Sequence, residues 1–466
     1  MTETCSPESA PNSGRLSGAW SRFVASPWAH RTLLFGVAVL ALGRIRHEVV
    51  GANDSSRYST MIALVERGSF DIREVPLSRR TMDKVRIGSG ELSSKPPLLS
   101  MVGAGIYALL HNCLDLSFAS NEGAVVFVIV ALLGTLPLVI LLALFWAFIR
   151  AEGVDANLAL GVTALLGLGT LCFPFGTILV NHLPSTTALF GAFYLSRSLR
   201  TGRMGSWKAY AGTGLLAALA VTFEPIAIFP VFALVVYVAL SMGGPRPAHG
   251  PSPAPEGADA PRGVPWVQAA AFLAGAALPA ALHFGVTWHT TGGLLPVQLR
   301  PELWHFDGSY WNNPRSWDAL AEPKWQYGLL CFFGGRGLIT LTPVLLLGFV
   351  GIARGLFRSG SLSNGGLPRA ESGLFLGGFT LLASYVILRT NNYGGGHYGM
   401  RWFLMLVPWL MLAAIPIISW ARSGWKRLGL VLLLLPGIYT AQVFWFGKPT
   451  VYELLLMRWG ILVLPP

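Results

Sequence analysis

The sequence predicts an all-α polytopic membrane protein, built as a bundle of about eleven transmembrane helices. Its 466 residues are 53% hydrophobic and only 12% charged, whereas a soluble domain carries about 25% charged residues. Apolar runs of about 17 residues or more recur along the chain, and each is long enough to cross a bilayer as a helix. The formal net charge of +12 is typical of basic cytoplasmic loops, so we expect no nucleic-acid partner.

The apolar runs divide the chain into two transmembrane modules. A polar cytoplasmic tail over residues 1–29 precedes the first span near 30–49. The Pro-, Ala- and Gly-rich segment 243–263 is typical of a flexible linker. It would join an N-terminal transmembrane module, 30–242, to a C-terminal one, 264–466. The other spans are expected near 123–149, 156–172, 184–200, 209–223, 225–242, 265–288, 337–357, 372–388, 401–420 and 429–446.

The basic loops give the chain an orientation. Lys and Arg gather in the short loops 197–208, 352–369 and 421–427, which the positive-inside rule places in the cytoplasm. With the N-terminus there too, 51–96 lies outside. An odd number of membrane crossings must then separate 51–96 from the first basic loop, 197–208, but four apolar segments lie between them. The weakest, 97–110, has a length that is more often interfacial than spanning, so we expect an external juxtamembrane helix there.

This orientation places most of the unusual polar residues on one face of the membrane. The binding or active face is therefore expected to be external, with the protein a multi-pass component of the bacterial inner membrane and its site periplasmic. The five external segments are 51–122, 173–183 with His182, the turn at Glu224, 289–336, and 389–400 with Tyr393, His397 and the adjoining Arg401.

The first external loop, 51–122, is the most informative of these segments. A connector between spanning helices usually has only a few residues, so a long polar one is more often a working part of the protein. Within it, Ser55–Arg67 carries apolar residues at helical spacing, which predicts an amphipathic helix. Asn53, Asp54 or Ser55 would cap that helix.

Two motifs in this loop resemble the GT-C superfamily of polyprenyl-phosphate-sugar glycosyltransferases. The similarity is to the branch of protein O-mannosyltransferases and lipid A aminoarabinose transferases. Those families place an acidic residue just after the first span and open a juxtamembrane helix with Lys-Pro-Pro-Leu or His-Pro-Pro. Here the counterparts are Asp54, in Asn-Asp-Ser-Ser-Arg-Tyr, and Lys95, in Ser-Lys-Pro-Pro-Leu. A looser likeness extends to Arg336-Gly337-Leu338 and to the stretch 393–401.

The resemblance implies a GT-C-like fold and a hexosyl or pentosyl transfer from a polyprenyl-phosphate-linked donor. The acceptor would be a lipid, a glycan or a protein, and membrane lipids would be further partners. Ser94 stands where these transferases often carry Glu, and Asn181-His182 stands where they often carry Asp. The use of a divalent metal therefore stays open, and we assign no metal ligand or other cofactor.

Such a transfer needs a carboxylate to orient the acceptor hydroxyl, cations for the phosphate, and an apolar groove for the isoprenoid. Asp54 fits the first role, as the catalytic carboxylate, with helix capping as the alternative. Lys95 fits the second, because Pro96 and Pro97 fix it at a helix start, where anions are favoured. Interfacial snorkelling is the alternative for Lys95.

The remaining candidates each have a structural alternative. Arg401 and Arg336 are candidate phosphate contacts, although an Arg at the end of a span often serves only as an anchor. The aromatic residues from Trp304 to Trp325 could stack on a sugar or form an interfacial belt. His182 could contact the acceptor, act as a second acid or base, or be purely structural. The candidate acceptor or sugar contacts are Arg57, Tyr58, His182 and His397.

Two other functions fit parts of the pattern. A lipid or solute transporter, or flippase, would explain the two modules and the cationic external face. Against it, the later spans hold few charged residues, and a transport path usually contains them. A non-catalytic membrane assembly factor would leave Asp54 and Lys95 with structural roles only.

Overall fold

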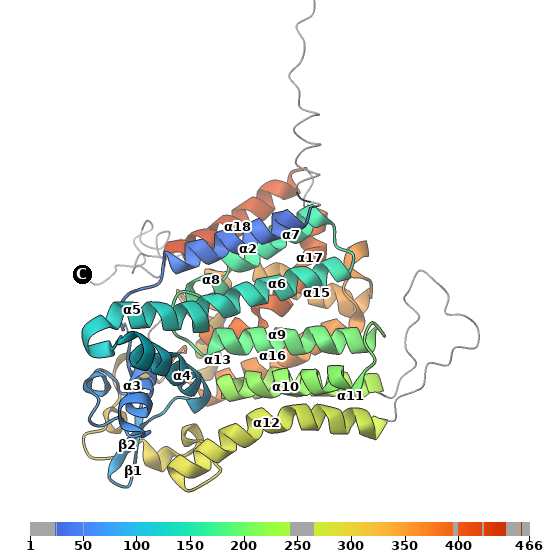
Figure 1. The fold of residues 1–466 in the computed structure, drawn as a ribbon. Helices are drawn as coiled ribbons and strands as arrows, with labels where there is room; N and C mark the ends of the chain where they lie inside the picture. Colours follow the sequence, from blue (N-terminus) through green and yellow to red (C-terminus); the bar gives the residue numbers. More distant parts are fainter. Residues whose placement is uncertain are drawn as a thin grey trace, which may run out of the picture.

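The computed structural model describes residues 24, 26–49, 51–242, 265–394, 399–421, 424–443 and 458. The described chain is mostly helical, as the sequence predicted, and its long helices lie side by side along a common direction (Figure 1). A helical hairpin region and a two-stranded sheet gather at one end of this bundle. The linker at 243–263 and most of the tail at 1–29 lie outside the described residues.

The helices and strands follow each other in a simple order. The first half contains α2 (Pro27–Leu42), α3 (Ala52–Arg67), β1 (Lys84–Ile87), β2 (Gly90–Ser93), α4 (Pro97–Leu114), α5 (Phe118–Val130), α6 (Leu136–Ala151), α7 (Ala156–Leu168), α8 (Cys172–Phe175), α9 (His182–Arg200), α10 (Trp207–Phe223) and α11 (Ile228–Met242). The second half contains α12 (Pro265–Thr291), α13 (Lys324–Phe333), α14 (Leu338–Leu341), α15 (Leu345–Phe357), α16 (Arg369–Arg389), α17 (Val407–Ala421) and α18 (Lys426–Val443).

The number of spans differs from the prediction. Among the described residues, five helices are long and apolar enough to cross a membrane, or up to six if one bent pair is a single span. Three more apolar helices are shorter, over Trp28–Leu42, Ala156–Leu168 and Pro225–Leu240. The predicted count of about eleven is therefore not confirmed, although a helix occupies each region where a span was expected.

The region predicted as one span at 337–357 is broken. The helical segment Lys324–Leu341 and the helix Leu345–Phe357 are bent by 99° at the break between them. The expected external loop 289–336 thus contains α13 and several short 3₁₀ turns. Pro343 lies inside the break and has no N–H to continue a helix, which accounts for the interruption.

α3 begins earlier than Ser55–Arg67, and this changes the place of Asp54 within it. The helix starts at Ala52, with extended Gly51 at the N-cap, and no side chain makes a capping hydrogen bond. The capping role considered for Asp54 is therefore wrong. Asp54 lies in the first helical turn, where its carboxylate faces the positive end of the helix dipole.

α4 is longer than the predicted juxtamembrane helix at 97–110. It continues to Leu114, has 18 residues, and is long and apolar enough to cross a membrane. The length argument against a span was therefore wrong. α4 packs along α3 at the end of the bundle that carries the sheet (Figure 1). Its juxtamembrane position remains a prediction that rests on the parity of the basic loops.

A β-hairpin in the first external loop was not predicted. β1 and β2 pair antiparallel, with Val85 opposite Leu92 and Arg86 opposite Glu91. Gly88 takes a positive φ of 57° in the connecting turn, a conformation that favours glycine. With only four residues in each strand, the hairpin needs its packing against α3 for stability.

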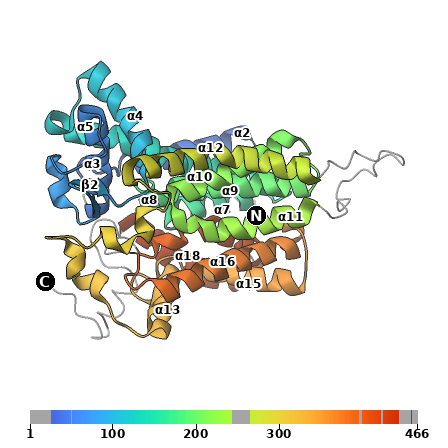
Figure 2. The ribbon, with the colours of Figure 1, turned by 90° about the horizontal axis from the view of Figure 1, so that it is seen from below.

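Small residues let the long helices approach closely. α12 lies alongside α10 (Figure 2), and a Cβ added at Gly275 would lie 1.9 Å from the Ala211 carbonyl oxygen. α15 meets α17 in the same way, since a Cβ added at Gly351 would lie 1.8 Å from the Ala413 carbonyl oxygen. Close backbone approach at small residues is a common way to pack helices in a membrane.

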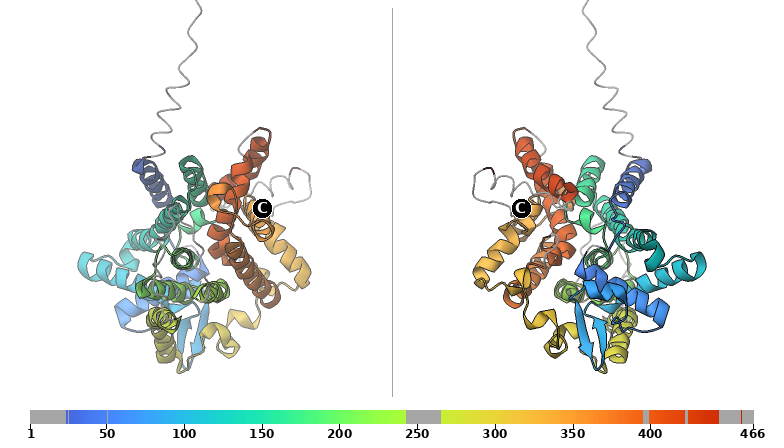
Figure 3. Two further views of the ribbon diagram at one scale, coloured as in Figure 1. Left: turned by 90° about the vertical axis from the view of Figure 1, so that its right-hand side faces the viewer. Right: turned by 90° about the vertical axis from the view of Figure 1, so that its left-hand side faces the viewer.

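Seen along the bundle, the early helices and α12 lie on one side, and the helices after α12 lie on the other (Figure 3). The connections α6–α7, α9–α10 and α15–α16 lie at the end opposite to α3 and the sheet (Figure 1). At that end Arg197 bridges two buried carboxylates, 3.1 Å from Glu152 and 3.0 Å from Glu371. This ion-pair network ties α9 to α16 and to the turn after α6.

Candidate active site

A cavity of about 720 Å³ lies at the end of the bundle that carries α3 and the sheet. Residues from all five segments that were expected on one face contribute to its lining, which confirms that these segments converge. Which side of the membrane they occupy remains a prediction. One lining residue from each segment, in chain order, is Lys95, His182, Glu224, Trp311 and Asn392.

Lys95 is held by a neighbouring carboxylate. Its Nζ lies 2.8 Å from Asp83 Oδ1, and both side chains are largely buried. Burial lowers the pKa of the Lys95 ammonium below its ordinary value, while Asp83 opposes this effect and Arg57 adds to it. The snorkelling alternative for Lys95 does not fit this arrangement, since the ammonium points at a buried anion and lines the cavity.

The backbone of Asp83 is fixed from three directions. Ser56 Oγ donates to the Asp83 carbonyl oxygen at 2.6 Å, and the Ser94 N–H donates to the same oxygen at 3.0 Å. The Asp83 N–H in turn donates to Thr81 Oγ1 at 2.9 Å. The chain thus holds Asp83 firmly between α3 and β2, with its carboxylate against Lys95.

A second group of polar side chains links α3 to the ends of α9 and α10. Arg57 Nη2 donates to Asn181 Oδ1 at 2.5 Å, and Asn181 Nδ2 donates to Glu224 Oε2 at 2.6 Å. His182 Nδ1 lies 3.0 Å from the same Glu224 oxygen. All four residues are buried and all four line the cavity.

Two buried guanidinium nitrogens in this region lack a partner. Within the part of the chain that the structure describes, Arg57 Nε and Arg401 Nε make no hydrogen bond. A buried N–H without a partner is costly, so such groups often serve a ligand or a bound water. Arg401 lies close enough to Asp83, Glu224 and Asp54 to feel their charges.

Asp54 lies beside the cavity without being one of its lining residues. Its neighbours Asn53 and Arg57 line it, and Asp54 Oδ1 lies 3.9 Å from Arg57 Nη1. Burial raises the pKa of the Asp54 carboxyl from 3.8 to about 6, against the opposing effect of Arg57 and Arg401. The ionised carboxylate is thus held at the edge of a cationic region, with an unusually high proton affinity.

The segment between α12 and α13 covers the cavity and is tied to the first loop. Trp311 Nε1 donates to the Met82 carbonyl oxygen at 2.9 Å, and Gln298 Nε2 donates to the Ser94 carbonyl oxygen at 2.6 Å. On the other side, Asn392 Nδ2 donates to Asp318 Oδ1 at 3.0 Å. Trp304 and Tyr310 also line the cavity, so these two aromatic side chains face the site together with Trp311.

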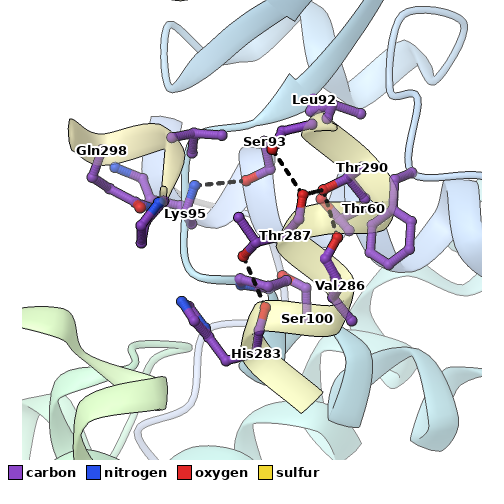
Figure 4. Close-up of a pocket in the computed structure, with 15 residues that line it drawn as sticks. Thr60, Leu92, Ser93, Lys95, Ser100, His283, Val286, Thr287, Thr290 and Gln298 are labelled. Carbon is purple, nitrogen blue, oxygen red and sulfur yellow. Dashed lines mark hydrogen bonds between the residues drawn. The ribbon is translucent and has the colours of Figure 1, made fainter. Parts of the chain in front are cut away.

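A smaller cavity of about 40 Å³ lies on the other side of Lys95, between α12 and the first loop (Figure 4). Lys95 and Gln298 line both cavities. The hydroxyls of Thr287 and Thr290 donate back to their own helix, to the carbonyl oxygens of His283 and Val286. A volume of this size can hold a few water molecules.

An apolar groove of about 490 Å³ runs along α6, α9 and α10. Leu99 and Phe223 line it. In the sequence, Leu99 follows shortly after Lys95 of the charged cavity, and Phe223 immediately precedes Glu224 of that cavity. Its other lining residues include Leu133, Ile140, Leu195 and Leu216. The charged cavity and the apolar groove share no lining residue, and they approach each other at the start of α4 and at the end of α10.

The structure brings together most, but not all, of the predicted site residues. Lys95, Arg57, His182 and Arg401 line one cavity, with Asp54 beside it. Tyr58 is 1% exposed and packs edge-on against Phe118, so the expected sugar contact is not supported. Arg336 is not a lining residue of the cavity either. His397 lies outside the described residues.

Three residues of the site were not assigned a role from the sequence: Asp83, Asn181 and Glu224. Glu224 carried the clearest signal, as a lone acidic residue between two apolar runs. Asn181 was marked only by its place where the resembled transferases often carry Asp, and the pairing of Asp83 with Lys95 left no local signal, because these partners are brought together by the fold. Among the described residues, no group of three His, Cys, Asp or Glu side chains is placed to hold a metal ion.

Comparisons with known proteins do not assign the chain to a family. No family model matches it, and no curated protein matches it. Its fold resembles two crystal structures of the Archaeoglobus fulgidus oligosaccharyltransferase. The apo form gives a TM-score of 0.46 at 14% identity, over 94% of this chain and 60% of that one. The complex with Zn and sulfate gives 0.45 at 14% identity, over 93% and 57%.

The chain thus spans about 60% of the length of that oligosaccharyltransferase. At TM-scores below 0.5 and 14% identity, this likeness does not identify the activity of the present chain.

Proposed function

We propose that this protein is an integral-membrane glycosyltransferase of the GT-C type. It transfers a hexose or pentose from a polyprenyl-phosphate-linked donor to a lipid, glycan or protein acceptor at the external face of the membrane. The observation that carries the proposal is the pairing of a charged, aromatic-lined cavity with an adjacent apolar groove. A donor with a phosphate, a sugar and an isoprenoid chain needs these two environments side by side.

The phosphate would lie between Lys95 and Arg401. Both cations line the cavity, and Arg401 Nε is buried without a hydrogen-bond partner among the described residues. Pro96 is the N-cap of α4 and Pro97 its first residue, so Lys95 stands at a helix N-terminus, where anions are favoured. In transfer, the two cations would stabilise the charge that develops on the departing phosphate.

Asp83 marks the position of the phosphate. It is the nearest counter-charge of Lys95, at 2.8 Å, and it is the strongest acidic influence on Arg401. A donor phosphate would take the place of the Asp83 carboxylate beside Lys95. The carboxylate then competes with the donor, and its removal should tighten donor binding.

The isoprenoid would occupy the apolar groove along α6, α9 and α10. Leu99 on α4 and Phe223 at the end of α10 line the groove, close in the chain to Lys95 and Glu224. A lipid whose phosphate binds Lys95 could therefore enter the groove directly. Burial of an isoprenoid there stabilises the complex by about 25 cal/mol for each Å² of apolar surface removed from water.

Asp54 would orient the acceptor hydroxyl through Arg57, which lines the cavity and lies 3.9 Å from Asp54. Trp304, Tyr310 and Trp311 would contact the sugar from the covering segment. His397 keeps its proposed acceptor contact on the strength of the sequence alone.

Lipid extraction tests the donor directly. Purified wild-type protein and Lys95→Ala protein are extracted with organic solvent, and the extracts are compared by mass spectrometry. Wild-type protein should carry a polyprenyl-phosphate sugar that Lys95→Ala protein has lost. Equal amounts in the two extracts, or none in the wild type, would remove Lys95 and the donor class from the proposal.

A further inference from the structure

Glu224 is a buried carboxylate whose position needs an explanation. It immediately follows α10, is 7% exposed, and lines the cavity. The C-terminal end of a helix carries partial negative charge, which disfavours an anion there. A buried carboxylate is also costly unless it is paired and hydrogen-bonded. Other groups must therefore hold it in place.

Its partners come from the start of α9. Asn181 Nδ2 donates to Glu224 Oε2 at 2.6 Å, and His182 Nδ1 lies 3.0 Å from the same oxygen. Arg57 donates to Asn181 in turn and so fixes the orientation of its amide. Burial opposes the ionised form of Glu224, but His182, Arg401 and Arg57 outweigh it and hold its pKa below the ordinary value.

His182 Nδ1 makes no hydrogen bond of good geometry within the described part of the chain, so Glu224 acts on the ring through its charge. A carboxylate 3.0 Å from Nδ1 favours the tautomer with its proton there, since an ionised carboxylate can only accept hydrogen bonds. The lone pair of the neutral ring then lies on Nε2. His182 is 3% exposed and lines the cavity, and Phe175 packs edge-on to its ring. The charged groups that face the ring are Glu224, after α10, Arg57, on α3, and Arg401, before α17.

Burial lowers the pKa of His182 below its ordinary value; Glu224 opposes this effect, and Arg401 and Arg57 add to it. The lowered pKa favours the neutral ring, which can accept a proton. A neutral histidine with a carboxylate beside one ring nitrogen has the arrangement of the base in a nucleophile–base–carboxylate triad. Asp54, by contrast, does not line the cavity.

We infer that Glu224 is a positioning residue that holds His182 as the base for the acceptor hydroxyl. The inference rests on the sugar transfer proposed above. His182 Nε2 takes the proton of the acceptor O–H as the acceptor oxygen bonds to the anomeric carbon. The bond from that carbon to the phosphate oxygen breaks, and its electron pair leaves with the polyprenyl phosphate. The proton on His182 then passes to water.

A purely structural role predicts different behaviour. If the pair only joined the start of α9 to the end of α10, its loss would lower stability, and turnover would fall only with folding. If His182 is the base and Glu224 its positioning residue, the two side chains instead affect the same chemical step. Their effects on kcat should then be non-additive, with the donor KM little changed.

The test uses full-length protein in proteoliposomes, with polyprenyl-phosphate hexoses and pentoses carrying a radiolabelled sugar and a membrane lipid extract as acceptor. His182→Gln and Glu224→Gln should each lower kcat by about 10²-fold. The double variant should be no slower than His182→Gln. Imidazole in the buffer should restore turnover to His182→Gly, because it supplies the missing base.

Glu122→Gln is the matched control, since Glu122 accepts from the Val49 N–H at 3.0 Å and does not line the cavity. It should keep full turnover. Three results, in a protein that still transfers sugar, would each overturn the pairing of Glu224 with His182 as the base. They are a normal kcat in folded Glu224→Gln protein, additive losses of kcat in the double variant, and no rescue of His182→Gly by imidazole. Wild-type protein that transfers no sugar would overturn the proposed function and this pairing together.

Discussion

Replacing Asp54 by Asn should make the protein more stable and less active. The substitution keeps the size of the side chain and removes its charge. Asp54 lies in the first turn of α3 and makes no capping hydrogen bond, so at the helix start the substitution removes only the interaction of its charge with the helix dipole. The two effects have separate causes, which lets one variant test both.

The gain in stability follows from the pKa of Asp54. Burial raises this pKa from 3.8 to about 6, and a rise of that size corresponds to about 3 kcal/mol at neutral pH. Because the folded pKa is the higher one, the stabilisation from this group is complete below pH 3.8 and lost as the pH rises through 6. The neutral amide of the Asp54→Asn variant avoids the cost of burying the ionised form, so about 3 kcal/mol is an upper limit to the gain.

The loss of activity follows from the position of Asp54 beside Arg57, 3.9 Å away. Without the carboxylate, the acceptor hydroxyl should be poorly oriented, and turnover should fall by about 10²-fold, the cost of misplacing a reacting group. Donor affinity should stay unchanged, because Lys95 and Arg401 remain. Melting in detergent, donor binding and sugar transfer are to be measured on the same preparation.

Asp71 offers a matched control in the same loop. It pairs with Arg73 at 2.6 Å, and this partner helps hold its pKa below the ordinary value against the effect of burial. Asp71→Asn should therefore leave turnover unchanged and should not raise stability. An Asp54→Asn protein that melts no higher than wild type at pH 7, or that keeps normal transfer, would refute the reasoning for that half of the prediction.

Three further outcomes are expected. Lys95→Ala should weaken donor binding more than Lys95→Arg does, and Asp83→Asn should tighten donor binding. Dissociation constants for the donor that stay unchanged in these variants would contradict the proposed phosphate site. Wild-type turnover should rise with pH through about 6, as Asp54 loses its proton, and an unaltered acid limb in Asp54→Asn would exclude Asp54 as its source. Gly275→Ala should lower the melting temperature, because the added methyl group forces α12 away from α10 at a cost of about 1–3 kcal/mol. Gly285→Ala is the control and should not lower it, since its methyl group meets open space. Equal melting temperatures for the two variants would contradict the close packing of α12 on α10.

The placement of five segments at one end of the bundle could be predicted, because loop charge and the length of apolar runs can be read directly from the sequence. These five segments are 51–122, 173–183, the turn at Glu224, 289–336 and 389–400. The same reasoning erred at α4, where the helix runs on to Leu114. A boundary of this kind depends on the local backbone, which composition does not determine.

The individual site residues depended on distant partners. Tyr58 belonged to the apolar stripe of α3 and is buried in the core, an outcome that the stripe itself favoured. The role of Glu224 depends on Asn181, which lies 43 residues earlier in the chain. Asp83 meets Lys95 only because the unpredicted hairpin folds the loop back on itself. Pairings of this sort follow from the fold and leave no local pattern.

Transfer of a radiolabelled sugar by the purified protein tests the central proposal most directly. The protein is reconstituted in sealed vesicles with a labelled polyprenyl-phosphate sugar, and lipid, glycan and peptide acceptors are added in turn. The label should leave the donor and become bound to one acceptor, and Lys95→Ala should abolish this transfer. Label that crosses the bilayer still attached to its polyprenyl phosphate, or that stays on the donor with every acceptor, would contradict it.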